Sequence, residues 1–178
     1  MAKSWISIEV VLVEGRGIDF WPRPGRVFAA SRSHTFAQLS NAIDVAFARW
    51  DFSHLHQFIL EDGTNLTTIF KELLFEDEMS AIDDRSTKLA ILKPGERFIY
   101  EFDFGDGWTH LCTVGEKRID PLETLGIIPS EPLPYWGWGT MPDQYGRNWD
   151  GDDGESPPPE NPEKRDLPKL YPGWGSRS

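Results

Sequence analysis

The stretch Phe98–Val114, FIYEFDFGDGWTHLCTV, decides the fold that we expect for this chain. In its first half every second residue is aromatic, which predicts the core face of a strand: Phe98, Tyr100, Phe102 and Phe104. An Asp-Gly pair follows, and this pair favours the centre of a tight hairpin turn because both central positions need positive φ. The stretch therefore predicts two antiparallel strands joined by a short turn.

The length of that turn decides where His110 lies. If Asp106 and Gly107 form a two-residue turn, His110 lies opposite Asp103, with the two Cβ atoms about 5 Å apart. A three-residue loop with a bulge would instead put His110 beside Phe102 on the core face. The sequence leaves both alternatives open, so His110 is either a site residue or a core residue.

The chain is acidic, with 18 basic and 29 acidic residues among 178 and a net charge of −11. Eight acidic residues and one lysine fall within Glu61–Asp84. This charge repels phosphate, so we expect neither nucleic acid nor an anionic membrane surface as a partner. A protein or small ligand with a cationic group fits better.

Two further features bear on location. No apolar run reaches the roughly 20 residues that a membrane-spanning helix needs. Cys112 is the single cysteine, so an intrachain disulfide and a multi-cysteine zinc cluster are both impossible. We therefore expect a cytoplasmic protein.

Upstream of the hairpin the pattern predicts more strands. Trp5–Val13 alternates and predicts a first strand, and residues 18–21 and 26–30 predict a second, interrupted one because prolines lie between them. His54–Leu60 predicts a strand with both histidines on one face, and Thr87–Leu92 is ambiguous between a strand and a helical turn.

Helical periodicity is clearest in Phe36–Trp50, where apolar residues recur at intervals of three and four. Thr35 and Gln38 match a capping box at its start. Leu66–Phe75 predicts a second, short helix. Together these elements predict an α+β domain, a mixed or mainly antiparallel sheet with one main amphipathic helix packed on it.

The composition changes after residue 118. We expect residues 1–118 to form the α+β core domain, 119–155 an irregular wrap rich in Gly and Trp, and 156–178 a Pro-rich tail that is extended or disordered. Glycine is costly in a helix, and large aromatic side chains can anchor irregular chain to a sheet.

These residues resemble the plasmid pRiA-type ORF-3-like family, also described as the insertion-element passenger TnpR type. The resemblance rests on Trp50-Asp51, on the His54-Leu55-His56 strand and on the DFGD-x-W-x-H hairpin from Asp103 to His110, and it extends from about Trp5 to Lys117. It implies an α+β fold and an association with plasmids and mobile elements. It implies no reaction. The family's cysteine-bearing segment has only a divergent counterpart here, Met141–Gly146.

One set of polar residues forms the main candidate site: His54, His56, Glu101, Asp103, Asp106, Trp108 and His110. Three interpretations are open. The groups form a hydrogen-bond network that fixes the hairpin, with Asp106 satisfying the turn amides. Alternatively, His54, His56, Asp103 and His110 bind a divalent metal such as zinc, iron or manganese, or they act as acid-base groups.

A second candidate is an aromatic surface made of Trp136, Trp138, Tyr145 and Trp149. Exposed rings of this kind stack on a ligand, whereas buried ones cover the sheet. The acidic run Asn148–Glu155 lacks the spacing of an EF-hand. Cys112 in a strand is either a small buried side chain or a nucleophile beside His110.

We therefore expect an accessory or binding module of plasmid or mobile-element type. Its polar face of His, Asp and Trp side chains would hold a protein or a small ligand. The alternative is a metal-dependent hydrolase that uses His54, His56, Asp103 and His110.

Overall fold

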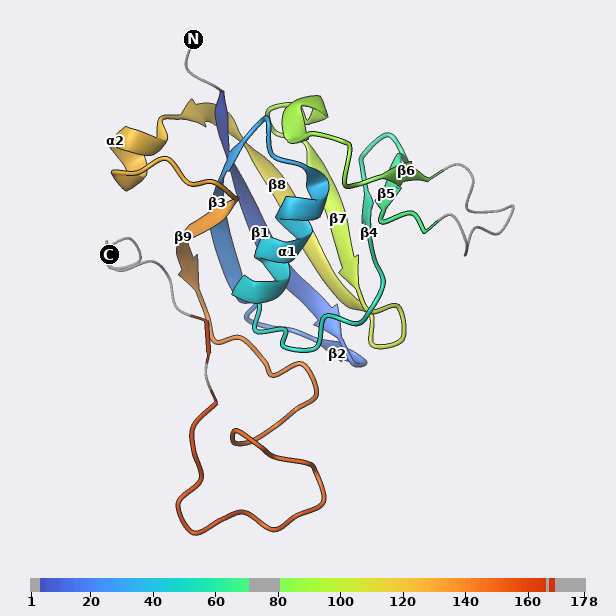
Figure 1. Ribbon diagram of the computed structural model, residues 1–178, viewed down its shortest axis with the longest axis vertical. Coiled ribbons are helices and arrows are strands. Elements are labelled where there is room, and N and C mark those ends of the chain that lie inside the picture. The colour runs from blue at the N-terminus through green and yellow to red at the C-terminus, as the bar shows by residue number, and fades with distance from the viewer. Residues whose placement is uncertain (1–3, 71–80, 166, 169–178) are drawn as a thin grey trace.

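The computed structural model describes residues 4–70, 81–165, 167 and 168 of the chain. Within these residues one large, mainly antiparallel sheet carries a single main helix, α1 (Phe36–Ala46), across one face (Figure 1). The expected α+β fold class is confirmed.

Nine strands make up the sheet in the described residues: β1 (Trp5–Gly15), β2 (Ile18–Asp19), β3 (Gly25–Ser31), β4 (His56–Ile59), β5 (Asn65–Thr67), β6 (Ile82–Asp83), β7 (Arg97–Phe102), β8 (Trp108–Ile119) and β9 (Leu133–Trp138). The order is β6-β5-β4-β7-β8-β1-β3-β9, and β2 pairs with β1. Only β5 and β6 run parallel among these pairs. The short helices are η3 (Leu89–Ile91), of 3-10 type, and α2 (Pro121–Leu125).

The core lies between α1 and the inner face of the sheet. Alternate residues of the central strands point into it and are almost fully buried, among them Ile8, Leu12, Tyr100 and Cys112. From α1 the buried residues recur at helical spacing, which confirms the apolar stripe expected there. Trp50, expected to end this stripe, is 44% exposed instead.

Both ends of α1 have identifiable hydrogen bonds. The capping box is confirmed, because the Thr35 hydroxyl accepts from the Gln38 amide and the Gln38 side chain accepts from the Thr35 amide. At the other end Ala48 adopts a φ of 64°, and the Arg49 amide donates to the Asp44 carbonyl. This Schellman motif ends the helix four residues before the expected Trp50.

The prediction of a second helix over Leu66–Phe75 is wrong at its start. Residues 65–67 form β5, in which Leu66 is buried and pairs with Phe58 of β4. Burial of Leu66 against the neighbouring strand outweighs a local helical pattern of only a few residues. Residues 71–80, which complete that expected helix and much of the acidic segment, lie outside the described residues.

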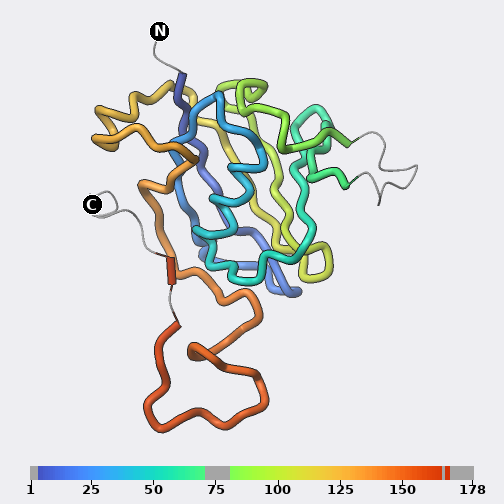
Figure 2. Tube along the Cα trace, viewed as in Figure 1, coloured from blue at the N-terminus to red at the C-terminus, as the bar shows by residue number. Residues whose placement is uncertain are grey.

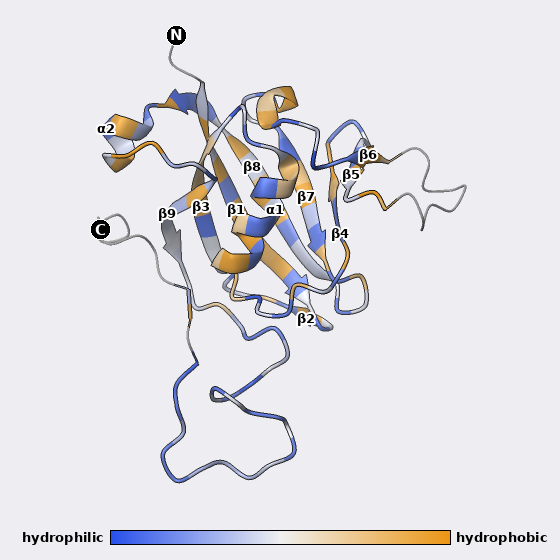
Figure 3. Ribbon diagram, viewed as in Figure 1, coloured by the Kyte–Doolittle hydropathy of each residue, from blue (hydrophilic) through white to orange (hydrophobic). Residues whose placement is uncertain are grey.

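The segment expected to wrap the domain contributes a strand of its own. β9 pairs with β3, so Trp136 and Trp138 lie on the edge of the sheet. Prolines are tolerated in an edge strand, which explains why this Pro-rich stretch pairs at all. Beyond Met141, which is buried, the chain runs out as a long loop (Figure 2), and this loop is mostly hydrophilic (Figure 3).

The hairpin has a longer turn than either alternative allowed. Phe102 pairs with Trp108 and Tyr100 with His110, which leaves residues 103–107 in the loop. His110 therefore lies on the core face, but beside Tyr100 and not Phe102. Two long-range bonds hold this loop open: Asp103 donates its amide to Leu55, and the Arg16 amide donates to the Asp106 carbonyl.

Candidate functional site

A cavity of about 190 Å³ opens between α1 and strands β4, β5 and β7. It could hold roughly six water molecules at liquid density. Its polar lining includes Ser40, Asn41, Asp44, His54, His56, Thr67 and Thr68, and its apolar lining consists of Phe52, Leu55, Phe70 and Phe102. Two of the three histidines expected in the site, His54 and His56, thus line this cavity.

His54 lies in the loop before β4, with about a third of its side chain exposed. The Tyr145 hydroxyl donates to Asp51 and lies 2.7 Å from His54 Nε2, so it accepts a bond from that ring nitrogen. On the other side Asp103 Oδ2 lies 3.5 Å from His54 Nδ1. Two carboxylates and a phenol therefore orient this imidazole.

His56 opens β4 and bonds to the carboxylate of Asp84, which is fully buried. The Thr68 hydroxyl donates to the other oxygen of Asp84 at 3.0 Å. A buried carboxylate needs such partners, because its desolvation is otherwise costly. The two bonds explain how Asp84 is accommodated next to the cavity.

Asp44 lies on α1, directly after Ile43 of the apolar stripe, and is 4% exposed. Tyr100 of β7 donates its hydroxyl to Asp44 Oδ1 at 2.8 Å. Burial raises the pKa of Asp44 to about 7, although the charge of Arg49 and the bond from Tyr100 oppose this. Asp44 is thus a carboxyl group poised to change charge near neutral pH.

His110 lies behind the cavity, where it is linked to Asp44 through Tyr100. Asp44, Tyr100, His110 and Arg49 form one buried network. Arg49 Nη2 lies 3.0 Å from His110 Nε2, and since a guanidinium can only donate, Nε2 accepts. The proton of the neutral ring is then on Nδ1, which donates to the Tyr100 carbonyl at 3.0 Å. Burial, with the charge of Arg49, lowers the pKa of His110 well below its usual range.

Arg49 is as buried as its partner. Its guanidinium lies over the Trp108 ring at 4.7 Å and donates to the Phe47 carbonyl. Burial lowers its pKa to about 10, which still leaves it charged at neutral pH. The Schellman motif at Ala48 turns the chain so that Arg49 enters the core at this point.

The structure does not bring the four expected metal ligands together. His110 has both nitrogens bonded in the core, whereas His54 and His56 line the cavity. Among the described residues no group of three or more His, Cys, Asp and Glu side chains could hold a metal ion.

Three other expected site residues have different roles. Glu101 faces the outer side of the sheet, where it pairs with Thr109 and where burial and the charge of Glu14 raise its pKa. Asp106 does not satisfy the turn amides, because Asp103 Oδ1 accepts from Gly105 and Asp106 instead. Trp108 is buried and does not line the cavity.

The four residues of the expected aromatic surface are spread along the chain. Trp136 and Trp138 lie in β9, and Trp138 donates to the Arg23 carbonyl. Tyr145 lies against the ring of Trp50 and contacts His54, and Trp149 follows in the long loop. Among the hydrogen bonds and ring contacts of the described residues, Tyr145 is the one member of the four that contacts a cavity-lining side chain, that of His54.

Cys112 lies in the middle of β8 and is fully buried, and burial raises the pKa of its thiol. A thiol of raised pKa is a poor nucleophile, so its interpretation as a small buried side chain fits the structure.

Sequence patterns missed Asp44, Arg49, Asp51 and Asp84. Asp44 carried a usable signal, because it is a carboxylate within the apolar stripe of α1, four residues after Ser40. Arg49 and Asp84 carried none, since their burial depends on a helix end and on pairing between distant strands.

In the described residues no helix is long and apolar enough to cross a membrane. No curated protein matches the sequence. Among solved structures, a protein of unknown function, MM3350 from Methanosarcina mazei Go1, is similar in fold, with a TM-score of 0.58 and 19% identity. The match covers 77% of this chain and 70% of that one.

The family model described as plasmid pRiA4b ORF-3-like protein matches residues 21–127. This range holds α1, the cavity and the complete β7–β8 hairpin. The chain belongs to the plasmid pRiA4b ORF-3-like family.

Proposed function

We propose that the protein is a binding module that takes the cationic group of a small organic ligand into the cavity lined by Asp44, His54 and His56. The observation that carries this proposal is the buried carboxyl group of Asp44 on the wall of a cavity. Burial disfavours the ionised form of Asp44 despite its bond from Tyr100, so a cation that enters the cavity and pairs with the carboxylate is stabilised.

Other groups around the cavity favour the same ligand. Asp84 lies behind His56, and Asp51 and Asp103 lie beside His54, so carboxylates outnumber imidazoles. The rings of Phe52 and Phe70 are half exposed at the cavity. Aromatic faces attract ammonium groups with about 0.5–2 kcal/mol each.

The cell context is part of the proposal. The family name supports an accessory role in a plasmid or mobile-element setting. The net charge of −11 favours a cationic ligand over nucleic acid, and the single cysteine is compatible with the reducing cytoplasm.

The test is calorimetric titration with n-propylammonium and with its neutral analogue 1-propanol. We expect the amine to bind and the alcohol not to bind. Affinity should rise as the pH increases through about 7, because the cation favours ionised Asp44. Asp44→Asn keeps an acceptor for Tyr100 but removes the charge, and should weaken amine binding at least about tenfold.

Asp62→Asn is the matched control, since Asp62 is an exposed carboxylate outside the cavity. It should leave the affinity unchanged. Equal binding of amine and alcohol, or equal loss in both variants, would refute the proposal.

A further inference from the structure

A second hollow lies at the opposite end of the sheet, where β1 begins and β8 ends. It encloses about 570 Å³, within the range of roughly 300–1,000 Å³ that small-molecule sites occupy. Its apolar wall consists of Trp5, Ile119, Pro121, Leu122, Ile128 and Pro129. Leu122 and Ile128 are 57% and 64% exposed, so they offer apolar surface that the fold leaves in water.

An adjoining hollow of about 410 Å³ shares Ser4 and Arg118 with the first. Arg32 and Lys117 line its wall. Arg32 donates to the carbonyls of Ala90 and Leu92, so its hydrogen bonds go to neutral groups. In the part of the chain that the structure describes, none of these three cations has a carboxylate within 4 Å.

Two carboxylates lie near these cations. Asp120 accepts from the Leu122 amide at 2.9 Å and so caps α2. Glu116 lines the adjoining hollow itself and, beside Gly95, also a separate acidic hollow. The combined lining is therefore net positive, in a chain whose net charge is −11.

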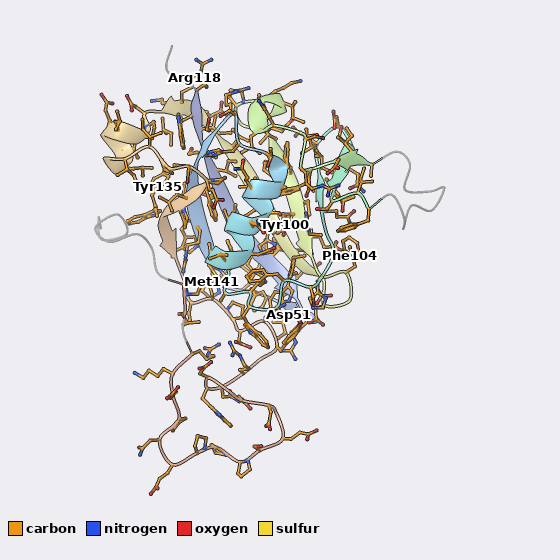
Figure 4. All side chains as sticks on the ribbon, viewed as in Figure 1. Asp51, Tyr100, Phe104, Arg118, Tyr135 and Met141 are labelled. Carbon is orange, nitrogen blue, oxygen red and sulfur yellow. The ribbon has the colours of Figure 1, made fainter. Side chains whose placement is uncertain are left out.

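A bulge between β1 and β8 shapes this end of the sheet. Ile6 pairs with Arg118 and Ile8 with Val114, so Ser7 alone faces residues 115–117. A Cβ at Gly115 would lie 2.2 Å from the Ser7 hydroxyl, so a larger residue at this position would displace the Ser7 side chain. Bulges of this kind redirect side chains next to binding sites. Figure 4 shows Arg118 at the end of the molecule away from Asp51 and Phe104.

We propose that the two hollows form one groove that binds a small amphiphilic organic anion. A carboxylate or sulfonate head pairs with Arg118, whose guanidinium forms two parallel bonds to such groups. The buried hydroxyl of Ser4, which has no partner within the described residues, donates to the same head. An aromatic or aliphatic body covers Trp5, Leu122 and Ile128.

The test uses two probes, 8-anilinonaphthalene-1-sulfonate and its uncharged analogue N-phenyl-1-naphthylamine, titrated by fluorescence. Arg118→Ala should weaken sulfonate binding at least about tenfold and leave the uncharged probe unchanged. Ile128→Glu should weaken both probes, and the exposure of Ile128 means that this change leaves the fold intact. Circular dichroism verifies the fold of each variant.

Two controls separate this groove from other sites. Arg165→Ala removes the same charge outside the groove and should not change binding. Asp44→Asn should leave sulfonate binding intact, so this test is independent of the proposed amine cavity. In ¹H–¹⁵N spectra the Trp5 indole resonance, assigned with Trp5→Phe, should shift on sulfonate addition while that of Trp138 stays in place. Sulfonate affinity unchanged in both groove variants, or a Trp5 resonance that does not move, would overturn the proposal.

Discussion

His110 connects Arg49 to Tyr100 in the buried network, because its ring accepts from Arg49 and donates to the Tyr100 carbonyl. Its lowered pKa means that it stays neutral in the folded protein, whereas the unfolded chain binds a proton there below about pH 6.5. The stability that His110 contributes is therefore present above that pH and is lost on acidification.

We expect His110→Gln to flatten the pH dependence of stability between about pH 5 and 6.5. The wild type should lose up to about 1.4 kcal/mol per pH unit more than the variant over this range, since one proton separates the two states. Glutamine keeps an acceptor for Arg49. Urea unfolding at several pH values measures the two slopes, and parallel slopes would contradict a neutral His110.

Sequence alone could place His54 and His56 near each other but not His110. The first two are neighbours in one segment, whereas the position of His110 depends on the length of the 103–107 loop. Asp103 adopts a φ of 59° there, and its amide bonds to Leu55 far upstream. A contact between distant segments leaves no pattern in the local sequence.

At the scale of elements, α1 shows both what sequence reveals and what it does not. Its start is encoded locally by Thr35 and Gln38, within one turn of the helix. Its end at Ala46 lacks the glycine that usually marks a Schellman motif, because Ala48 occupies the left-handed position. Because no glycine marks the end of the helix, the sequence pattern predicted that α1 would extend to Trp50.

Ala48→Gly should therefore stabilise the protein, by about 0.5–1 kcal/mol. Alanine in the left-handed region costs about 1–2 kcal/mol, and the greater freedom of glycine in the unfolded chain offsets part of the gain. Ala37→Gly in the first turn of α1 is the matched control and should destabilise by up to about 1 kcal/mol. Equilibrium unfolding in guanidinium chloride measures both, and a loss of stability in both variants would contradict the interpretation.

At the scale of the whole molecule, the sheet continues beyond the expected boundary at residue 118. β9 covers the edge of β3, and Gln144 accepts from the amides of Trp50 and Asp51. These contacts lie between segments about 90 residues or more apart. The change to a Gly-, Pro- and Trp-rich composition after residue 118 therefore does not mark the limit of the sheet.

We expect a chain shortened to residues 1–155 to unfold cooperatively near the wild-type temperature. A chain shortened to 1–118 exposes the β3 edge and leaves the Gln144 partners unsatisfied, so it should melt at least about 10 °C lower or aggregate. Thermal unfolding followed by circular dichroism, with light scattering, compares the two. A 1–118 chain as stable as the 1–155 chain would show that β9 is dispensable.

The burial of Cys112 also affects how the chain ages in a cell. Its thiol is fully buried in β8, which lies between β7 and β1, out of reach of oxidants and of small disulfides. The sulfur becomes reactive only when β8 separates from its neighbours, which requires global opening. Oxidative modification at this position therefore records past unfolding and, while it persists, opposes the return of β8 to the sheet; a mixed disulfide is reversed by reduction, whereas oxidation to the sulfonic acid is permanent.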